Sequence, residues 1–286
     1  MSLVSPSAPA RLLGRLLDLV YPRRCGGCDR LGAWLCADCL AALQPPALPG
    51  WMCPVCNGPL VAGPGGAGCP LGCDSGGLLG VLAAGAYADP LSAAIKRLKY
   101  QNWQVLAAPL AGLLATTCAA YPAPWGAAAV PQLVAVPLHR RRLRERGFNQ
   151  AALLARALGA RLDWPTVAGL ARVRYTAPQA RLTADERAVN LEEAFAWQGP
   201  APPPSAPLVL VDDVYTRGFT LNLCADALRA AGAGAVYGVV LARTGGEPFY
   251  EGLHRAGTKS AQNELHHKDT KNTKISIWGG KFILWG

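Results

Sequence analysis

From Val81 onward, the chain alternates short apolar runs with longer stretches of helical periodicity. Three near-continuous apolar runs predict strands that are buried on both faces: Leu133–Pro137, Leu208–Asp212 and Val236–Ala242. Between them, Gln150–Leu162 and Leu221–Ala231 place apolar residues at helical spacing, and Gly232 follows as a helix terminator. Strands that alternate with helices predict an α/β fold with a mostly parallel sheet flanked by helices.

Two further apolar stretches raise the question of a membrane span or a leader. The uncharged region Tyr100–His139 contains Val105–Ala120, which is short, includes a proline and relies on alanine. It predicts a buried helix, since a span needs about 20 strongly apolar residues. Near the start, Leu12–Val20 is interrupted by Arg15 and Asp18, so it predicts an amphipathic helix and not a secretory signal. We therefore expect a cytoplasmic protein without a membrane span.

The composition is that of a globular protein with an excess of positive charge. Of the 286 residues, 51% are hydrophobic and 16% are charged, and the net charge is +10. Such an excess favours partners that carry phosphate. The segment Gly257–Gly286 differs from the rest, because it holds five of the seven lysines and a single alanine. We interpret it as an appended or foreign tail, with a natural basic tail as the alternative, and exclude it from fold prediction.

Eight of the ten cysteines form four close pairs: Cys25/Cys28, Cys36/Cys39, Cys53/Cys56 and Cys69/Cys73. Three pairs have C-x2-C spacing and the last has C-x3-C spacing. Each such turn presents two thiolates to one metal, and two turns complete a tetrahedral zinc site. The four pairs therefore predict two structural zinc ions, each bound by two pairs and without an open position for water. The pairs could combine in sequential or in crossed order.

Other uses of these cysteines fit the pattern less well. A disulfide framework would need an oxidising compartment, and nothing in the sequence directs export. A redox C-x-x-C usually occurs singly beside a βαβ pattern, whereas this segment holds four pairs. The remaining Cys118 and Cys224 stand alone on apolar helical patterns and are expected to be buried.

The most distinctive chemistry lies in the stretch VLVDDVYTRGFT, where an apolar run ends in Asp212 and Asp213 before a loop with a glycine. A strand, a loop and a helix start, in this order, place the loop at the carboxyl edge of the sheet, where α/β proteins bind ligands. Backbone N–H groups at the helix start, with the hydroxyls of Thr216 and Thr220, suit a phosphate. Carboxylates instead suit sugar hydroxyls or Mg²⁺, so a ribose phosphate satisfies both ends. The alternative is an ordinary βα turn in which the aspartates cap a helix.

This loop resembles the ribose-phosphate loop of type I phosphoribosyltransferases, and the chain as a whole resembles their ComF branch (competence protein F-like). The cysteine pairs are similar to that family's double zinc ribbon. Three segments resemble the first helix of its larger domain, its most recognisable stretch and its mobile active-site loop: YADPLSAAIKRLKY (87–100), VPLHRRRLRERGFNQAALLARAL (136–158) and RVRYTAPQARLTADERAVNLEEAF (172–195). The resemblance covers about 25–243.

The resemblance implies a type I phosphoribosyltransferase-like domain preceded by a small zinc-binding domain. We expect an amphipathic helix within 1–24, the double zinc ribbon at 25–78 and the larger domain at 79–245. The appended tail, non-native or disordered, would occupy 246–286.

The resemblance also implies a site for phosphoribosyl pyrophosphate (PRPP) and Mg²⁺, in which a nucleophile displaces pyrophosphate from C1 of the sugar. Asp212 and Asp213 would hold the ribose and the metal. The 5′-phosphate would contact Tyr215, Thr216, Arg217, Gly218, Phe219 and Thr220, and the pyrophosphate would contact Leu138, His139 and Arg140. The arginines at 140–146 and 172–187 would neutralise charge and form a closing lid, or else form a solvated basic face and a surface loop. Asn149 is expected to cap the helix that follows.

The loop departs from the family pattern, since TRGFT stands where TTGAT is usual. Arg217 would add a phosphate contact, and the bulk of Phe219 is expected to narrow the approach of an anion. The family is also linked to DNA uptake. The alternative function is therefore a non-catalytic module that binds single-stranded DNA, with DNA-uptake proteins as partners, through the zinc ribbon and the arginines.

Overall fold

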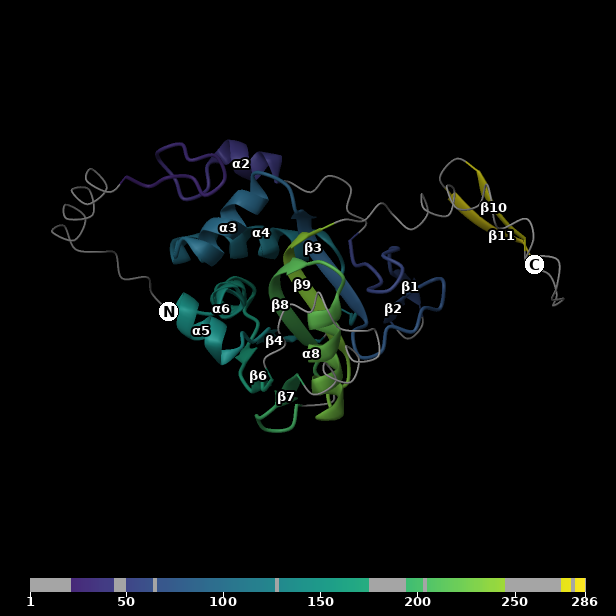
Figure 1. Cartoon of the computed structure of the whole chain (residues 1–286). Helices are drawn as coiled ribbons and strands as arrows, with labels where there is room; N and C mark the ends of the chain where they lie inside the picture. The colour runs from purple at the N-terminus through teal and green to yellow at the C-terminus, as the bar shows by residue number, and fades with distance from the viewer. Residues whose placement is uncertain are drawn as a thin grey trace, which may run out of the picture. The chain divides into compact units, whose positions relative to one another are not determined.

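The structure, a computed structural model, describes residues 22–43, 50–63, 66–126, 129–174, 194–202 and 205–244, and two strands near the C-terminus. The chain divides into two compact units, Met1–Gly246 and Glu247–Gly286. In the second unit, β10 (Lys274–Trp278) pairs antiparallel with β11 (Lys281–Trp285) (Figure 1). The predicted helix at 12–20 and most of the predicted lid at 172–190 lie outside the described residues.

Five parallel strands form the sheet of the first unit. Their order is β3 (Gly80–Ala86), β9 (Val236–Arg243), β8 (Leu208–Tyr215), β4 (Gln132–Ala135) and β5 (Thr166–Val167). β3, β8 and β9 are buried at nearly every position, as expected for strands covered on both faces. The predicted α/β fold with a parallel sheet flanked by helices is confirmed.

Residues of β8 alternate between two apolar cores, one on each face of the sheet. Val209 and Val211 belong to the core that includes α3 (Leu91–Tyr100), α4 (Ala107–Ala120) and α6 (Gln150–Leu162). Leu208 and Leu210 belong to the core that includes α8 (Phe219–Ala230). Helices therefore cover both faces, with α8 lying against one of them (Figure 1).

The helical predictions are confirmed with small shifts of their bounds. The helix at 150–162 forms as predicted, and Asn149 caps it by accepting a hydrogen bond of 3.0 Å from the amide of Ala151. The uncharged stretch at 105–120 forms the short η1 (Gln104–Leu106) and then α4, which is largely buried. In the part of the chain that the structure describes, every helix is too short or too polar to span a membrane.

The cysteine-rich segment holds little regular structure apart from α2 (Ala37–Ala42) and the hairpin of β1 (Val61–Gly63) and β2 (Gly66–Gly68). It is joined to the sheet by Met52, which exchanges two backbone hydrogen bonds of 2.9 Å with Val81 in β3. The cysteine-rich segment and the sheet therefore lie in one compact unit.

Two smaller elements border the sheet. The antiparallel pair of β6 (Leu170–Arg172) and β7 (Phe195–Trp197) forms a separate small sheet. Helix α5 (Arg140–Arg146) follows β4 and has no buried residue.

The strand order creates a switch point between β4 and β8. From β4 the chain crosses to β5, and from β8 it crosses in the opposite direction to β9. The segments that leave the carboxyl ends of these two neighbouring strands therefore diverge, which opens a crevice at this edge.

Candidate functional site

A cavity of about 380 Å³ lies at this switch point. Its lining combines residues at the two strand ends with basic and aromatic residues from the surrounding elements: Leu138, Asp212, Asp213, Thr216, Thr220, Lys99, Tyr100, Arg142, Arg146, Gln150 and Arg172 among others. A second cavity of about 420 Å³ shares part of that lining, namely Lys99, Tyr100, Arg142 and Arg146. Two carboxylates thus face a cavity that is otherwise strongly basic.

Asp213 is a buried carboxylate with only one of its oxygens engaged. Its side chain is 4% exposed, and its Oδ1 lies 2.6 Å from Nζ of Lys99 at the end of α3. Its Oδ2 is buried and has no hydrogen-bond partner among the described residues. A buried acceptor without a donor is costly, so this oxygen is suited to a hydroxyl group or a cation from a ligand.

Asp212 is partly buried, and its Oδ1 accepts a hydrogen bond of 2.8 Å from the amide of Asp213. Burial, and after it the charge of Asp213, raise the pKa of Asp212 to about 8, although the backbone amide of Asp213, Lys99 and Arg146 act in the opposite direction. A ligand that carries positive charge, such as a metal ion, would therefore release a proton from Asp212 on binding.

The loop after the aspartates leads into the N-terminus of α8. Gly218 is the residue before the helix and adopts φ of 78°, a left-handed conformation that glycine tolerates best. No side chain caps this end, so the first amides of α8 have no capping partner among the described residues. Thr216 and Thr220 line the cavity on either side of this turn. The arrangement suits an anion.

Only some of the residues that were predicted to bind the anion line the cavity, and the others face solvent or pack elsewhere. Of the loop residues, Thr216 and Thr220 line the cavity, whereas Arg217 and Phe219 point to solvent, and Phe219 is 62% exposed. Tyr215 is 4% exposed, and its hydroxyl donates to the carbonyl of Pro54 instead. The small Gly218 is buried against the ring of Tyr215.

In the segment after β4, too, only some of the predicted residues line the cavity. Leu138 lines the cavity, whereas His139 and Arg140 do not belong to its lining. His139 is the residue before α5 and caps it, because its Nδ1 accepts a hydrogen bond of 3.2 Å from the amide of Arg141. Arg142 and Arg146, one turn apart on α5, reach the cavity in place of Arg140.

Sequence reasoning gave no role to several residues of the cavity, among them Lys99 and Gln150. Lys99 pairs with Asp213, and Gln150 accepts a hydrogen bond from Arg146, whose guanidinium also lies 5.4 Å from the ring of Tyr100. A signal for Lys99 was present, because Lys96 and Lys99 are the only lysines before the tail in a chain that otherwise uses arginine.

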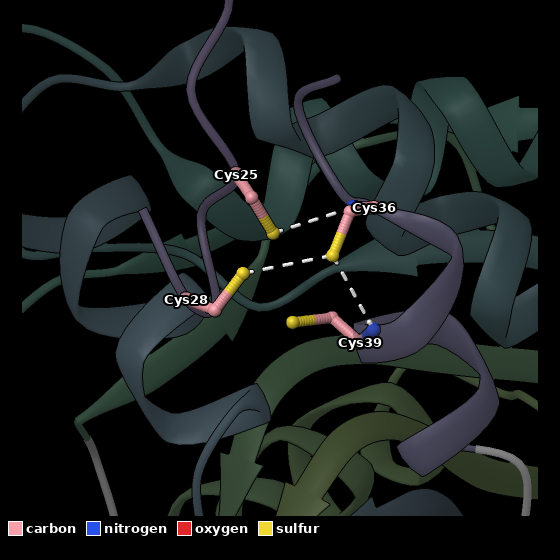
Figure 2. Close-up of side chains that lie close together, drawn as sticks. All are labelled: Cys25, Cys28, Cys36 and Cys39. Carbon is pink, nitrogen blue, oxygen red and sulfur yellow. Dashed lines mark hydrogen bonds between the residues drawn. The ribbon is translucent and has the colours of Figure 1, made fainter. Parts of the chain in front are cut away.

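The eight paired cysteines form two clusters in sequential order. Cluster 1 is Cys25, Cys28, Cys36 and Cys39 (Figure 2), and cluster 2 is Cys53, Cys56, Cys69 and Cys73. Within each cluster the four sulfur atoms lie within 4.8 Å of one another, and all ten cysteines are free thiols. Tetrahedral zinc with Zn–S bonds of about 2.3 Å places its sulfurs about 3.8 Å apart. Both clusters therefore fit a structural zinc ion, and the predicted pair of zinc sites is supported by their geometry.

Backbone amides surround these sulfurs, as thiolate ligands require. In cluster 1 the amide of Cys36 donates to Sγ of Cys25 at 3.3 Å, and in cluster 2 the amide of Gly58 donates to Sγ of Cys56 at 3.4 Å. The two unpaired cysteines differ from this pattern: Cys224 is buried as expected, whereas Cys118 is only partly buried.

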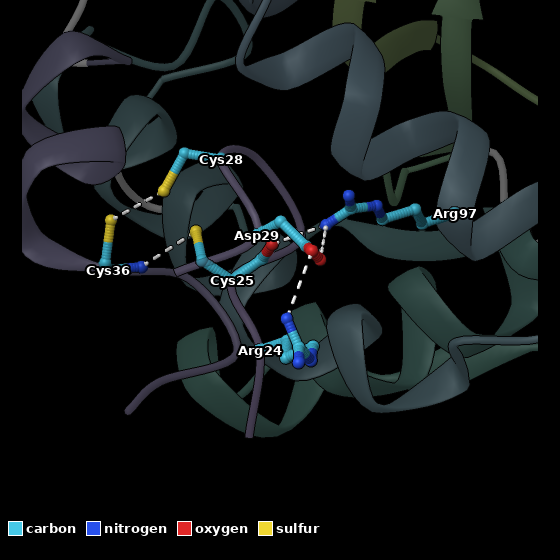
Figure 3. Close-up of polar contacts among 6 residues, drawn as sticks. All are labelled: Arg24, Cys25, Cys28, Asp29, Cys36 and Arg97. Carbon is cyan, nitrogen blue, oxygen red and sulfur yellow. Dashed lines mark hydrogen bonds and ion pairs between the residues drawn. The ribbon is translucent and has the colours of Figure 1, made fainter. Parts of the chain in front are cut away.

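Cluster 1 is attached to α3 through Arg97, as Figure 3 shows. The guanidinium of Arg97 donates to the carbonyl of Cys25 at 2.5 Å and pairs with Asp29 at 3.2 Å. Two residues further along the same helix, Lys99 pairs with Asp213 in the cavity. Helix α3 thus contacts cluster 1 and the cavity with neighbouring basic residues.

Comparison with known proteins places the chain in a family. No protein-family model matches it. It is 38% identical to DNA utilization protein YhgH of Escherichia coli strain K12 over 160 residues, which cover 55% of this chain and 69% of that protein. It is 38% identical to Competence protein F of Haemophilus influenzae over 156 residues, 52% and 66% of the two chains. It is also 36% identical over 103 residues to Competence protein ComFC of Bacillus subtilis, with 36% and 40% covered. The chain therefore belongs to the ComF family of competence protein F-like proteins.

Proposed function

We propose that the cavity at the carboxyl ends of β4 and β8 binds PRPP or a related ribose-phosphate nucleotide, together with Mg²⁺. One observation carries the proposal: two adjacent carboxylates and an uncapped helix N-terminus face the same cavity. Few ligands need both features at once. A ribose 5-phosphate unit does, because its hydroxyl groups donate hydrogen bonds while its phosphate accepts them.

The acidic end is suited to the sugar hydroxyls. Asp212 offers a partly exposed carboxyl group, and Oδ2 of Asp213 is an acceptor without a donor among the described residues. Lys99 holds the other oxygen of Asp213, so this carboxylate is fixed before a ligand arrives. A fixed acceptor binds without the entropy cost of ordering a mobile side chain.

The 5′-phosphate would lie at the N-terminus of α8, between the hydroxyls of Thr216 and Thr220. Helix N-termini bind phosphate through free amides and through the positive end of the helix dipole. Phe219 leaves the cavity clear, because its side chain is 62% exposed and does not belong to the lining.

The pyrophosphate would face the basic side of the cavity, beside Leu138, Arg142 and Arg146. In a phosphoribosyl transfer, the bond between C1 and the pyrophosphate oxygen breaks while C1 bonds to the acceptor. The residues of the chain would act by positioning the sugar and by neutralising the pyrophosphate that departs with the bonding electrons.

Mg²⁺ fits the acidic end on the chemistry of its donors. It usually takes one or two protein carboxylates and completes its octahedron with water and phosphate oxygens. Asp212 and the unengaged Oδ2 of Asp213 are oxygens of this kind. The two zinc ions, each with four cysteine ligands, would be structural because no position remains open to substrate.

Titration calorimetry with PRPP and Mg²⁺ tests the proposal. We expect the wild type to bind, and Asp212→Asn to bind at least about tenfold more weakly, since a charged hydrogen-bond acceptor is lost. Asp163→Asn is the matched control, because Asp163 is exposed at the end of α6 in a left-handed conformation that asparagine also adopts. Absence of binding by the wild type, or equal affinity of the two variants, would overturn the proposal.

A second candidate function is the binding of single-stranded DNA during DNA uptake. The names of the relatives favour it, as do the five arginines of α5, a helix without a buried residue. Phosphate contacts by several arginines would make the affinity fall steeply with salt. A flat salt response, or no binding of an oligonucleotide, would remove this candidate. The two functions are compatible, because α5 presents Arg142 and Arg146 to the cavity and its other arginines elsewhere.

A further inference from the structure

Tyr215 connects the loop at the cavity with a cysteine cluster far away in the sequence. It lies between the aspartates and the phosphate-binding turn, yet its side chain is 4% exposed and leaves the cavity. Its hydroxyl donates a buried hydrogen bond of 3.0 Å to the carbonyl oxygen of Pro54. A tyrosine hydroxyl that is buried needs a partner, and this one takes its partner from the cysteine-rich segment.

Pro54 belongs to the knuckle of cluster 2, between Cys53 and Cys56. The knuckle is closed by backbone hydrogen bonds from the amide of Cys53 to Gly58 at 2.8 Å and from Asn57 to Cys53 at 2.9 Å. The amide of Val55 also donates to Sγ of Cys53 at 3.4 Å. The position of the Pro54 carbonyl therefore depends on the geometry of the metal-binding turn.

The other end of the link is Gly218, the residue before α8. A Cβ atom at Gly218 would lie 2.5 Å from the hydroxyl oxygen of Tyr215, so the turn is folded directly over that hydroxyl group. The carbonyl of Gly218 accepts the first hydrogen bond of the helix, from Asn222 at 2.9 Å. Moving the Tyr215 hydroxyl would therefore move the amides that face the phosphate.

A second contact joins cluster 2 to the same edge of the sheet. Arg243, which pairs with Tyr215 across β8 and β9, donates to Sδ of Met52 at 3.0 Å, and Met52 precedes Cys53. The amide of Thr244, which lines the cavity, donates to the carbonyl of Tyr215 at 2.9 Å. Both strands thus contact residues next to Cys53 of cluster 2, namely Pro54 and Met52, where they end at the cavity.

We propose that cluster 2 positions the phosphate-binding turn through Tyr215, so that metal occupancy of cluster 2 sets the affinity for the phosphate end of the ligand. Tyr215 is a positioning residue in this scheme and does not touch the ligand. The identity of the ligand rests on the proposed function. Cluster 1 has a different attachment, through Arg97 to α3, and supplies a natural comparison (Figure 3).

The first test compares Tyr215→Phe with Tyr237→Phe in the full-length protein. Both tyrosines are 4% exposed on neighbouring strands, and each substitution removes only a hydroxyl group. We expect Tyr215→Phe to weaken PRPP binding about threefold to tenfold, within the range of one lost hydrogen bond, and Tyr237→Phe to leave it unchanged. Binding of Mg²⁺–pyrophosphate should be unaffected in both, since it occupies the other end of the cavity. Equal weakening of both ligands would mean a general structural defect and would overturn the proposal.

The second test is a double-mutant cycle with a cluster ligand. Cys73→Ser in cluster 2 should weaken PRPP binding in the wild type but add little in Tyr215→Phe, because the link is already broken. Cys28→Ser in cluster 1 should have the same effect in both backgrounds. Additive effects for Cys73→Ser would contradict the proposal.

A measurement without ligand separates this proposal from the proposed function. Hydrogen exchange of the amides of residues 216–220 should become faster in Tyr215→Phe and in Cys73→Ser, and should stay unchanged in Tyr237→Phe. If exchange becomes faster but the wild type does not bind PRPP, the coupling through Tyr215 is supported and the proposed ligand is wrong. Unchanged exchange in Tyr215→Phe would reject the link.

Discussion

Lys99 at the end of α3 and Asp213 in β8 form an ion pair of 2.6 Å at the edge of the cavity, with side chains 18% and 4% exposed. The pair fixes one oxygen of Asp213 and leaves the other without a partner among the described residues. It also joins the helix that contacts cluster 1 through Arg97 to the strand that carries Asp212 and Asp213.

Removing the cation should destabilise the protein strongly. Lys99→Met would leave Asp213 buried without its partner, and we expect a loss of about 3 kcal/mol in the free energy of unfolding, measured with denaturant. Lys96→Met is the control, since Lys96 is exposed on the same helix, and should change stability by less than about 0.5 kcal/mol. Lys99→Met combined with Asp213→Asn should recover part of the loss. Equal stability of the two lysine variants would contradict a buried pair.

Asp212 should give the apo protein a distinctive pH dependence. Its pKa is raised to about 8 in the folded state from an ordinary value near 3.8, chiefly by burial, so the folded state binds a proton more tightly than the unfolded state. The stability that this contributes is complete below about pH 4 and is lost as the pH rises through about 8. Asp212→Asn should lack this loss, so the difference in Tm between variant and wild type should grow in favour of the variant from pH 5 to pH 9. Parallel Tm curves would count against a raised pKa.

The cysteine clusters should bind two zinc ions per chain. Elemental analysis of the purified protein should give two, with one each in Cys39→Ser and Cys56→Ser. Cys118→Ser, which lies outside both clusters, should retain two. Chelation should unfold the cysteine-rich segment, because binding of a structural metal contributes directly to folding. A single zinc in the wild type would refute the grouping into two clusters.

Gly218→Ala should be more harmful than an alanine at a glycine with the same backbone conformation. Gly147, after α5, has φ of 80° and ψ of −12°, close to the 78° and −9° of Gly218. A Cβ at Gly147 meets nothing within 4 Å, whereas at Gly218 it would collide with Tyr215. Both variants carry about 1 kcal/mol of backbone strain, and Gly218→Ala should lose at least about 1 kcal/mol more in unfolding experiments. Similar losses would mean that the turn does not pack on Tyr215 as described.

Deleting Gly257–Gly286 should leave the first unit intact. The segment falls within the second compact unit, whereas the residues of the sheet and of the cavity belong to the first. We expect the free energy of unfolding to change by less than about 1 kcal/mol, measured by denaturant titration of the full-length and shortened proteins. A larger loss would mean that the segment contributes to the fold and is not an appended tail.

The sequence predicted the fold better than it predicted the individual side chains of the site. Strands 208–212 and 236–242 were visible because strands covered on both faces are apolar throughout, although β8 continues past the aspartates to Tyr215. Side-chain direction was not visible. The contiguous loop 215–220 was predicted to contact one ligand. In a strand and a tight turn, however, the side chains of successive residues point in different directions. Tyr215 therefore reaches Pro54, and Phe219 reaches solvent.

The site residues that the sequence did not predict take their place through contacts between distant segments of the chain. Lys99 belongs to the site only because the fold brings the end of α3 beside Asp213 of β8, and no spacing within its own segment encodes that contact. Arg142 and Arg146 were recognised as part of a basic run, but their selection over Arg140 follows from the start of α5 at that residue. Helical spacing then places 142 and 146 on one face.

A crystal structure of the protein with PRPP and Mg²⁺ tests the central claim most directly. The account predicts ribose hydroxyl groups at the carboxylates of Asp212 and Asp213, with the 5′-phosphate at the amides that begin α8 between Thr216 and Thr220. A ligand bound elsewhere, or a phosphate turned toward the aspartates, would contradict it.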